Sequence, residues 1–195
     1  MIDRALDALR QVVAGFLLRL PELNVTSDSV VVLSPLVKPD GSVAIPENSL
    51  ALTLVCLEEE RVLRAQAAVS TDLNGRVSHR NPEVKLNLYV MVTSHFKNYK
   101  TALEFLSAAV RLFQSRNVFT PGDIPALEGV AEKLVVELHS LDFEQQNHLW
   151  ASLGAKYMPS VMYKVRMLMI QESQKSGEQE PVMTINFSDR SIWGR

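Results

Sequence analysis

The sequence predicts an α/β domain in which apolar helices pack on a β-sheet. The clearest indication is the stretch 86–121, where a strand pattern passes directly into a helix pattern. Successive side chains of a strand point to opposite faces, so one face of the predicted strand 86–93 is strongly apolar. That face carries Leu86, Leu88, Val90 and Val92. The opposite face is only half polar, which favours a strand inside the sheet with its second face covered. It carries Asn87, Tyr89, Met91 and Thr93.

The predicted helix begins after Asn98, whose side chain is a good acceptor for the free N–H groups of a first helical turn. Its apolar residues recur at intervals of three and four, which produces one buried stripe. The stripe comprises Ala102, Leu103, Leu106, Ala109, Val110 and Phe113, widened by Tyr99, Phe105 and Leu112. We therefore expect Leu106 and Phe113 to belong to the structural core.

The N-terminal region predicts a helix, a strand and a hairpin. Residues 2–20 form one apolar face at helical spacing, and Pro21 ends the helix. A short run rich in β-branched residues at 30–33 predicts a strand. A loose hairpin is expected over 34–48, because Pro39-Asp40-Gly41 is a turn sequence.

A second strong strand is predicted over 50–57. The alternation of this strand places Cys56, the only cysteine, on one face with three leucines. We therefore expect Cys56 to be a small apolar residue of the core. A charged patch follows at 58–61, and residues 62–69 fit either a strand or a helix. Residues 70–82 are polar, contain an Asn-Gly turn sequence and predict an exposed loop.

The C-terminal half predicts two further strands around a second helix. The strand at 133–139 directs Leu134, Val136 and Leu138 inward. A helix begins at Asp142, which forms a capping pattern with Gln145, and its apolar face carries Phe143, Trp150 and Leu153. Gly154 is placed to end it in a left-handed conformation. The last core strand is expected over 161–170, with Trp150 and Gly154 as structural residues of the core.

The composition changes after residue 170. Residues 171–181 contain no large apolar residue and predict a linker. Residues 182–188 alternate between apolar and polar side chains and predict a short strand. We therefore expect one domain over residues 1–170 and a linker with an extended C-terminal arm over 171–195.

Charge and cysteine content exclude several classes of protein. The formal net charge is −2, which argues against a nucleic-acid binder. A single cysteine forms no intrachain disulfide, which fits synthesis in a reducing compartment. Charges interrupt the apolar N-terminus and no small-residue cleavage site follows, so we expect no signal peptide. No apolar run approaches the roughly 18 residues of a spanning helix, so we expect no direct membrane insertion.

The sequence contains no recognisable catalytic constellation, and it predicts no metal or cofactor. None of the four histidines stands in a metal-binding frame, and phosphate-loop and nucleophile-elbow motifs are absent. Glu58, Glu59 and Glu60 point alternately to opposite faces of a strand, so they do not converge on a metal. An enzyme or small-ligand module using the patch 58–61 is the alternative from a different class.

Three segments together resemble a known family. They are residues 1–11, 86–121 and 132–170, and the most specific part reads LWxxLGxKYxPSVxYKVRML between Leu149 and Leu168. They are similar to the cap, or tube-terminator, family of extracellular contractile injection systems. These systems are phage-tail-like particles such as the antifeeding prophage and the Photorhabdus virulence cassettes. The resemblance covers residues 1–170 and is weaker after Gln171.

The resemblance implies a structural role without catalysis. It implies a mixed, largely antiparallel sheet with packed helices, as in phage tail terminators. It further implies a homo-hexameric ring, made in the bacterial cytoplasm, that ends the inner tube and anchors the last layer of sheath protein. The terminator of a true phage tail, which contacts a head connector, is the alternative within this class. We hypothesise an assembly interface that includes Lys156, Tyr157, Lys164, Arg166, Val182, Met183, Thr184, Ile185, Asn186 and Phe187.

Overall fold

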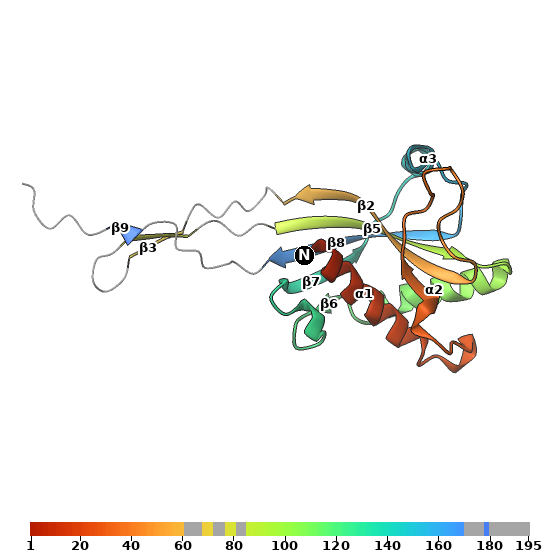
Figure 1. The fold of residues 1–195 in the computed structure, drawn as a ribbon, viewed down its shortest axis with the longest axis horizontal. Helices are drawn as coiled ribbons and strands as arrows, with labels where there is room; N and C mark the ends of the chain where they lie inside the picture. Colours follow the sequence, from red (N-terminus) through yellow and green to blue (C-terminus); the bar gives the residue numbers. More distant parts are fainter. Residues whose placement is uncertain (61–67, 72–76, 81–84, 170–177, 180–195) are drawn as a thin grey trace, which may run out of the picture. The chain divides into compact units, whose positions relative to one another are not determined.

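The computed structural model describes residues 1–60, 68–71, 77–80, 85–169 and 178–179. The chain divides into two compact units, one of residues 1–62 and 84–170 and the other of residues 63–83 and 171–195. The first unit contains the helices and a six-stranded sheet (Figure 1). The second contains a small three-stranded sheet.

The six-stranded sheet has the order β1-β2-β5-β8-β7-β6. Its strands are β1 (Val31–Leu33), β2 (Ser49–Glu59), β5 (Lys85–His95), β6 (Val118–Phe119), β7 (Ala131–Leu138) and β8 (Ser160–Met169). All neighbouring pairs are antiparallel except β1 with β2. This arrangement confirms the predicted mixed, largely antiparallel sheet with packed helices.

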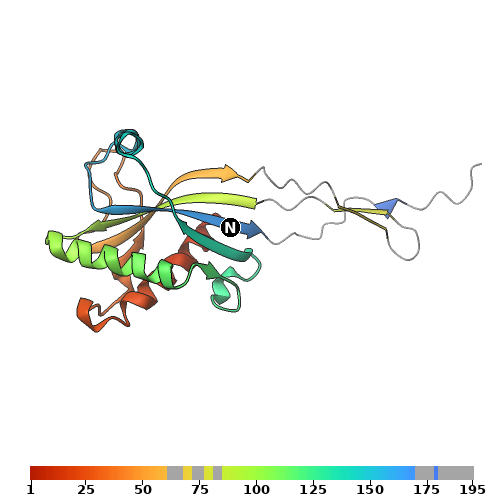
Figure 2. The ribbon, with the colours of Figure 1, turned by 180° about the vertical axis from the view of Figure 1, so that it is seen from behind.

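Helices α1 (Ile2–Leu17) and α2 (Tyr99–Ser115) cover one face of this sheet, and α3 (Phe143–Leu153) lies on the opposite side (Figures 1 and 2). Short 3-10 helices occur at η1 (Pro21–Leu23), η2 (Asp28–Val30) and η3 (Pro125–Leu127). The helix α1 ends three residues earlier than predicted. Leu20 is already extended, because a residue that precedes proline avoids the helical conformation.

The larger core lies between the sheet and the two helices α1 and α2. Its fully buried side chains include Leu9, Leu17, Leu50, Leu88, Phe119, Leu134 and Met167. Phe113 is buried as predicted, and its ring lies 4.8 Å from that of Tyr163. Leu106 is partly buried and packs against the same cluster. The side chain of Asn98 accepts the N–H of Lys100, which confirms the predicted N-cap.

The buried stripe of α2 is rotated from the predicted one. Leu103 and Tyr99 are 40% and 66% exposed, so their assignment to the buried stripe is wrong. The residues that face the sheet are Ala102, Phe105, Ala108, Ala109, Leu112 and Phe113. The three alanines leave space for close approach, and Phe105 stacks on Phe96 with ring centroids 4.4 Å apart.

A smaller core lies on the other face of the sheet, beneath α3 and the hairpin that spans residues 34–48. It comprises Leu36, Ile45, Ala51, Met91, Trp150 and Met162. The hairpin is confirmed by the pairing of Val37 with Val43. The capping box of Asp142 and Gln145 and the left-handed Gly154, at φ 64°, confirm both predicted ends of α3.

Three further predictions about individual apolar residues are wrong. Phe143 is 92% exposed, because it lies at the first position of α3, before the part of the helix that packs on the sheet. Leu138 is 56% exposed and belongs to neither buried cluster. Cys56 is exposed because β2 has an irregularity between Leu54 and Cys56 that resets its alternation.

The second unit changes the interpretation of two segments. Strands β3 (Ala68–Thr71), β4 (Val77–Arg80) and β9 (Glu178–Gln179) pair in that order, all antiparallel. The predicted exposed loop 70–82 therefore contains a strand, and so does the predicted linker 171–181. The Asn74-Gly75 turn and the predicted strand 182–188 lie outside the described residues.

We predict that Trp150→Ala destabilises the fold by about 3–5 kcal/mol, because it empties the centre of the smaller core. Phe143→Ala on the same helix is the matched control, and its side chain is almost fully exposed. Urea unfolding followed by circular dichroism measures both. Equal unfolding midpoints for Trp150→Ala and the wild type would show that Trp150 is not a core residue.

The connection after α2 is held by an ion pair. The Arg116 guanidinium contacts the carboxylate of Asp123, which also accepts the Thr120 hydroxyl at 2.8 Å. These contacts lower the pKa of Asp123 from its usual 3.8 to about 2, and the contact with Arg116 has the largest effect. A lowered carboxyl pKa stabilises the folded state above the usual pKa, and this contribution is lost as the pH falls towards the folded pKa.

We therefore expect part of the acid destabilisation between about pH 4 and pH 2 to come from Asp123. The variant Asp123→Asn should be less stable than the wild type at pH 6, and the difference should shrink towards pH 2. Thermal unfolding at several pH values tests this. A difference that is independent of pH would contradict it.

Candidate assembly surface

The sheet register gathers polar and charged side chains on the face opposite α1 and α2. Asn87 pairs directly with Glu58 and Arg166, and Tyr89 pairs with Lys164. Directly paired residues of antiparallel strands point to the same face. The polar face is defined here as Glu58, Glu60, Asn87, Tyr89, Glu137, His139, Lys164 and Arg166. The polar face and the smaller core beneath α3 occupy different parts of the same face of the sheet.

Tyr89 is the centre of the polar face. Its hydroxyl donates to the Glu58 carboxylate at 3.0 Å, and its ring meets the His139 ring edge-on at 5.1 Å. The Lys164 ammonium lies 5.9 Å from the ring centroid, at the limit of a cation–π contact. Desolvation raises the pKa of Tyr89, and the hydrogen bond to Glu58 raises this pKa further. The phenol therefore stays protonated and donates to Glu58.

Two further contacts join neighbouring strands. Arg166 on β8 donates to Glu137 on β7 at 2.7 Å, and both side chains are about half exposed. Asn87 is buried and donates its amide to Glu60 at 3.1 Å. The exposed Arg166–Glu137 pair contributes little to stability, because water already solvates the separate charges. The Glu137 carboxylate and the Arg166 guanidinium can therefore exchange this contact for one with a partner protein at a small cost in free energy of folding.

The structure separates the residues of the hypothesised interface. Lys164 and Arg166 lie together on the polar face. Lys156 and Tyr157 are exposed in the connection between α3 and β8, where the Tyr157 ring contacts Trp150 edge-on at 5.5 Å. Residues 182–187 lie outside the described part of the chain. Sequence reasoning placed Tyr89 on the less apolar face of its strand without giving it a role, and it weighed Glu58 only as part of the charged patch 58–61.

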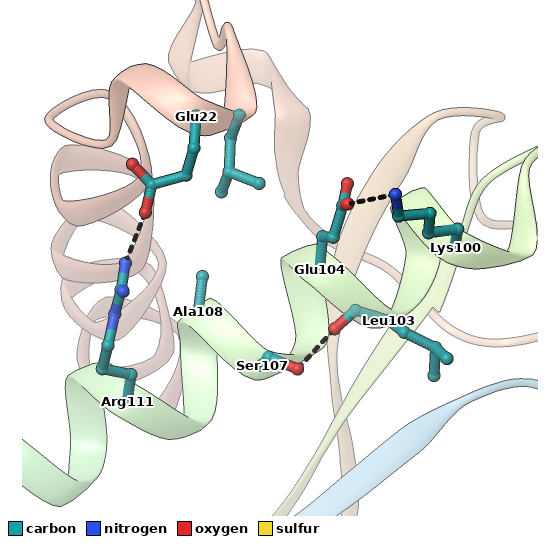
Figure 3. A pocket seen from close by; sticks show the side chains of 8 residues that line it. Glu22, Lys100, Leu103, Glu104, Ser107, Ala108 and Arg111 are labelled. Carbon is teal, nitrogen blue, oxygen red and sulfur yellow. Dashed lines mark hydrogen bonds and ion pairs between the residues drawn. The ribbon is translucent and has the colours of Figure 1, made fainter.

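The hollow between η1 and α2 is also lined by charged side chains (Figure 3). It encloses about 400 Å³, and Glu22 accepts from Arg111 at 2.9 Å across it. The Lys100 ammonium lies 3.9 Å from Glu104. Each carboxylate in this lining already has a cationic partner, and the Arg111 contact lowers the pKa of Glu22. The hollow therefore presents no uncompensated charge to a ligand.

Two negative findings apply to the described residues only. They contain no cluster of histidine, cysteine and carboxylate side chains that would hold a metal ion. They also contain no helix with the length and apolar character needed to cross a membrane.

Comparison with known proteins finds a matching family model and similar solved structures, two of which are described here. The family model of the Pvc16 N-terminal domain matches residues 5–184. A sheath/tube terminator of an extracellular contractile injection system, PVC, in its extended state is similar in structure, with a TM-score of 0.57 and 14% sequence identity. The match covers 96% of this chain, which spans 62% of the length of that terminator chain.

The second solved structure is the tube-terminating cap of the anti-feeding prophage, with a TM-score of 0.48 and 16% identity. This match covers 72% of the present chain and 49% of the cap. No curated protein sequence matches the chain.

Proposed function

The chain belongs to the Pvc16 N-terminal domain family, and on this premise we propose that it is the cap of a contractile injection system. In this role six copies form a ring at the end of the inner tube. The ring stops addition of tube subunits and anchors the last layer of sheath protein. The unit of residues 1–62 and 84–170 forms the body of the ring, and the unit of residues 63–83 and 171–195 serves as an arm.

One observation carries the proposal. The fold of nearly the whole chain is similar to that of a sheath/tube terminator, with a TM-score of 0.57 over 96% of the chain. The family membership supports the same role independently.

The geometry of the sheet is consistent with this role. A rotational ring of identical subunits closes on itself, so it leaves no position for a further subunit of the tube. The polar face presents exposed charges of both signs on rigid strands. Such a surface orients a partner by charge complementarity and makes the contact sensitive to salt. We assign the polar face, with Lys164 and Arg166, to the contact with tube or sheath protein.

The full chain mixed with the tube protein of its own particle tests the proposal. Negative-stain electron microscopy should show tubes closed at one end by a density with sixfold symmetry. Native mass spectrometry should give six copies for each capped end. Tubes that grow unchanged in its presence, or a monomer or twofold dimer at the tube end, would exclude the cap role.

We predict that Lys164→Glu combined with Arg166→Glu weakens attachment to tube or sheath roughly tenfold. The reversal removes two cations from the polar face, and both residues are at least partly exposed, so the fold should persist. Lys97→Glu is the matched control, because Lys97 is 72% exposed and lies outside the polar face. Cosedimentation with assembled tubes and with sheath measures the effect. Equal losses in both variants would reject this assignment of the polar face.

A further inference from the structure

Large apolar side chains are exposed at both edges of the six-stranded sheet. The strand order makes β6 one edge and β1 the other. Val118 lies on β6, Leu138 ends the neighbouring strand β7, and Phe143 begins α3 after it; these side chains are 41%, 56% and 92% exposed. Near the β1 edge lie Leu33 and Leu54, which are 39% and 37% exposed. Phe143 is therefore an aromatic knob that contacts almost nothing in its own chain.

A groove lies at the β1 edge. Its apolar lining includes Leu6, Leu33, Leu36, Leu52, Leu54 and Leu153, and it encloses about 420 Å³. The two hydroxyls in the lining are already bonded, since Thr53 donates to the Ser34 carbonyl at 2.7 Å and Ser34 donates to that of Pro35 at 2.8 Å. The lining therefore offers an occupant apolar contact and no free hydroxyl donor.

The groove is large enough for a phenyl ring. A cavity of about 150 Å³ lined by apolar side chains already binds benzene. An aromatic side chain that leaves water for such a site contributes a large apolar area to an interface.

The knob and the groove do not meet within one chain. Phe143 is the first residue of α3 and follows β7, whereas Leu153, the last residue of α3, lines the groove beside β1. A rise of 1.5 Å per residue separates the two ends of this helix by about 15 Å. The helix α3 thus holds the knob and the groove apart on the surface of one subunit.

We infer that Phe143 of one copy occupies the β1-edge groove of the next copy. This inference rests on the proposed ring and specifies its repeated contact. Knob and groove are different surfaces, so the contact is head-to-tail, and each added copy leaves one knob and one groove free until the ring closes. A second copy is the favoured occupant, because the same chain carries both halves of the contact and α3 keeps them from meeting within one subunit.

Two variants that each remove one half of the contact test the inference. Phe143→Asp removes the knob, and a carboxylate in the first turn of a helix is favourable, so α3 is retained. Leu33→Asp places a carboxylate in the groove and so blocks it. If the Leu33→Asp variant fails to fold, Leu54→Asp is used in its place. Tyr99→Asp is the matched control, because Tyr99 is 66% exposed on α2 and lines neither feature.

Sedimentation velocity and native mass spectrometry of the full chain measure assembly. The wild type and Tyr99→Asp should form closed rings, and each of the other variants should raise the concentration for half-assembly at least about tenfold. A 1:1 mixture of Phe143→Asp and Leu33→Asp should form heterodimers and nothing larger, since one knob and one groove remain intact.

Three results would overturn the inference: a wild type that stays monomeric, a Phe143→Asp variant that assembles like the wild type, or a mixture without heterodimers. Tube-end binding separates this contact from the cap role. Phe143→Asp rings on tube ends would disprove the contact alone. Wild-type rings that assemble through Phe143 but never bind tube would disprove the cap role alone.

Discussion

The structure depends on the register of β5 between β2 and β8. This register places Leu88, Val90 and Val92 beneath α1 and α2, and it places Tyr89 and Met91 on the opposite face. A shift by one residue would exchange the two faces and expose the larger core to water. Both cores and the polar face follow from this one pairing, because each uses alternate residues of the same three strands.

The helices cover the two faces of the six-stranded sheet unequally. Two long helices close the inner face, whereas α3 and the hairpin close only the part of the outer face around Met91 and Trp150. Among the described residues, the part beyond this cover carries Tyr89 and the Arg166–Glu137 ion pair. A subunit that is stabilised from one side can present the other side to partners without losing its fold.

The resemblance to cap proteins that the sequence predicts is confirmed by the family match, and the predicted fold is confirmed by the similarity to a tube terminator. The residues on which that resemblance rests include Trp150, which is a buried residue of α3, and Gly154, which ends this helix. In the proposed ring, the polar face and the apolar contact have different roles. We propose that the polar face binds tube or sheath and that Phe143 and the β1-edge groove join copies of the chain.

The sequence by itself determined the local features. The cap at Asn98, the capping box at Asp142 and the glycine at position 154 depend on residues a few positions apart, so their pattern is sufficient. Only the tertiary structure decided which side of α2 is buried, why Cys56 is exposed, and that Tyr89 lies between Glu58 and Lys164. These features depend on strand pairing and packing between distant residues, and a bulge in one strand is enough to reverse an alternation.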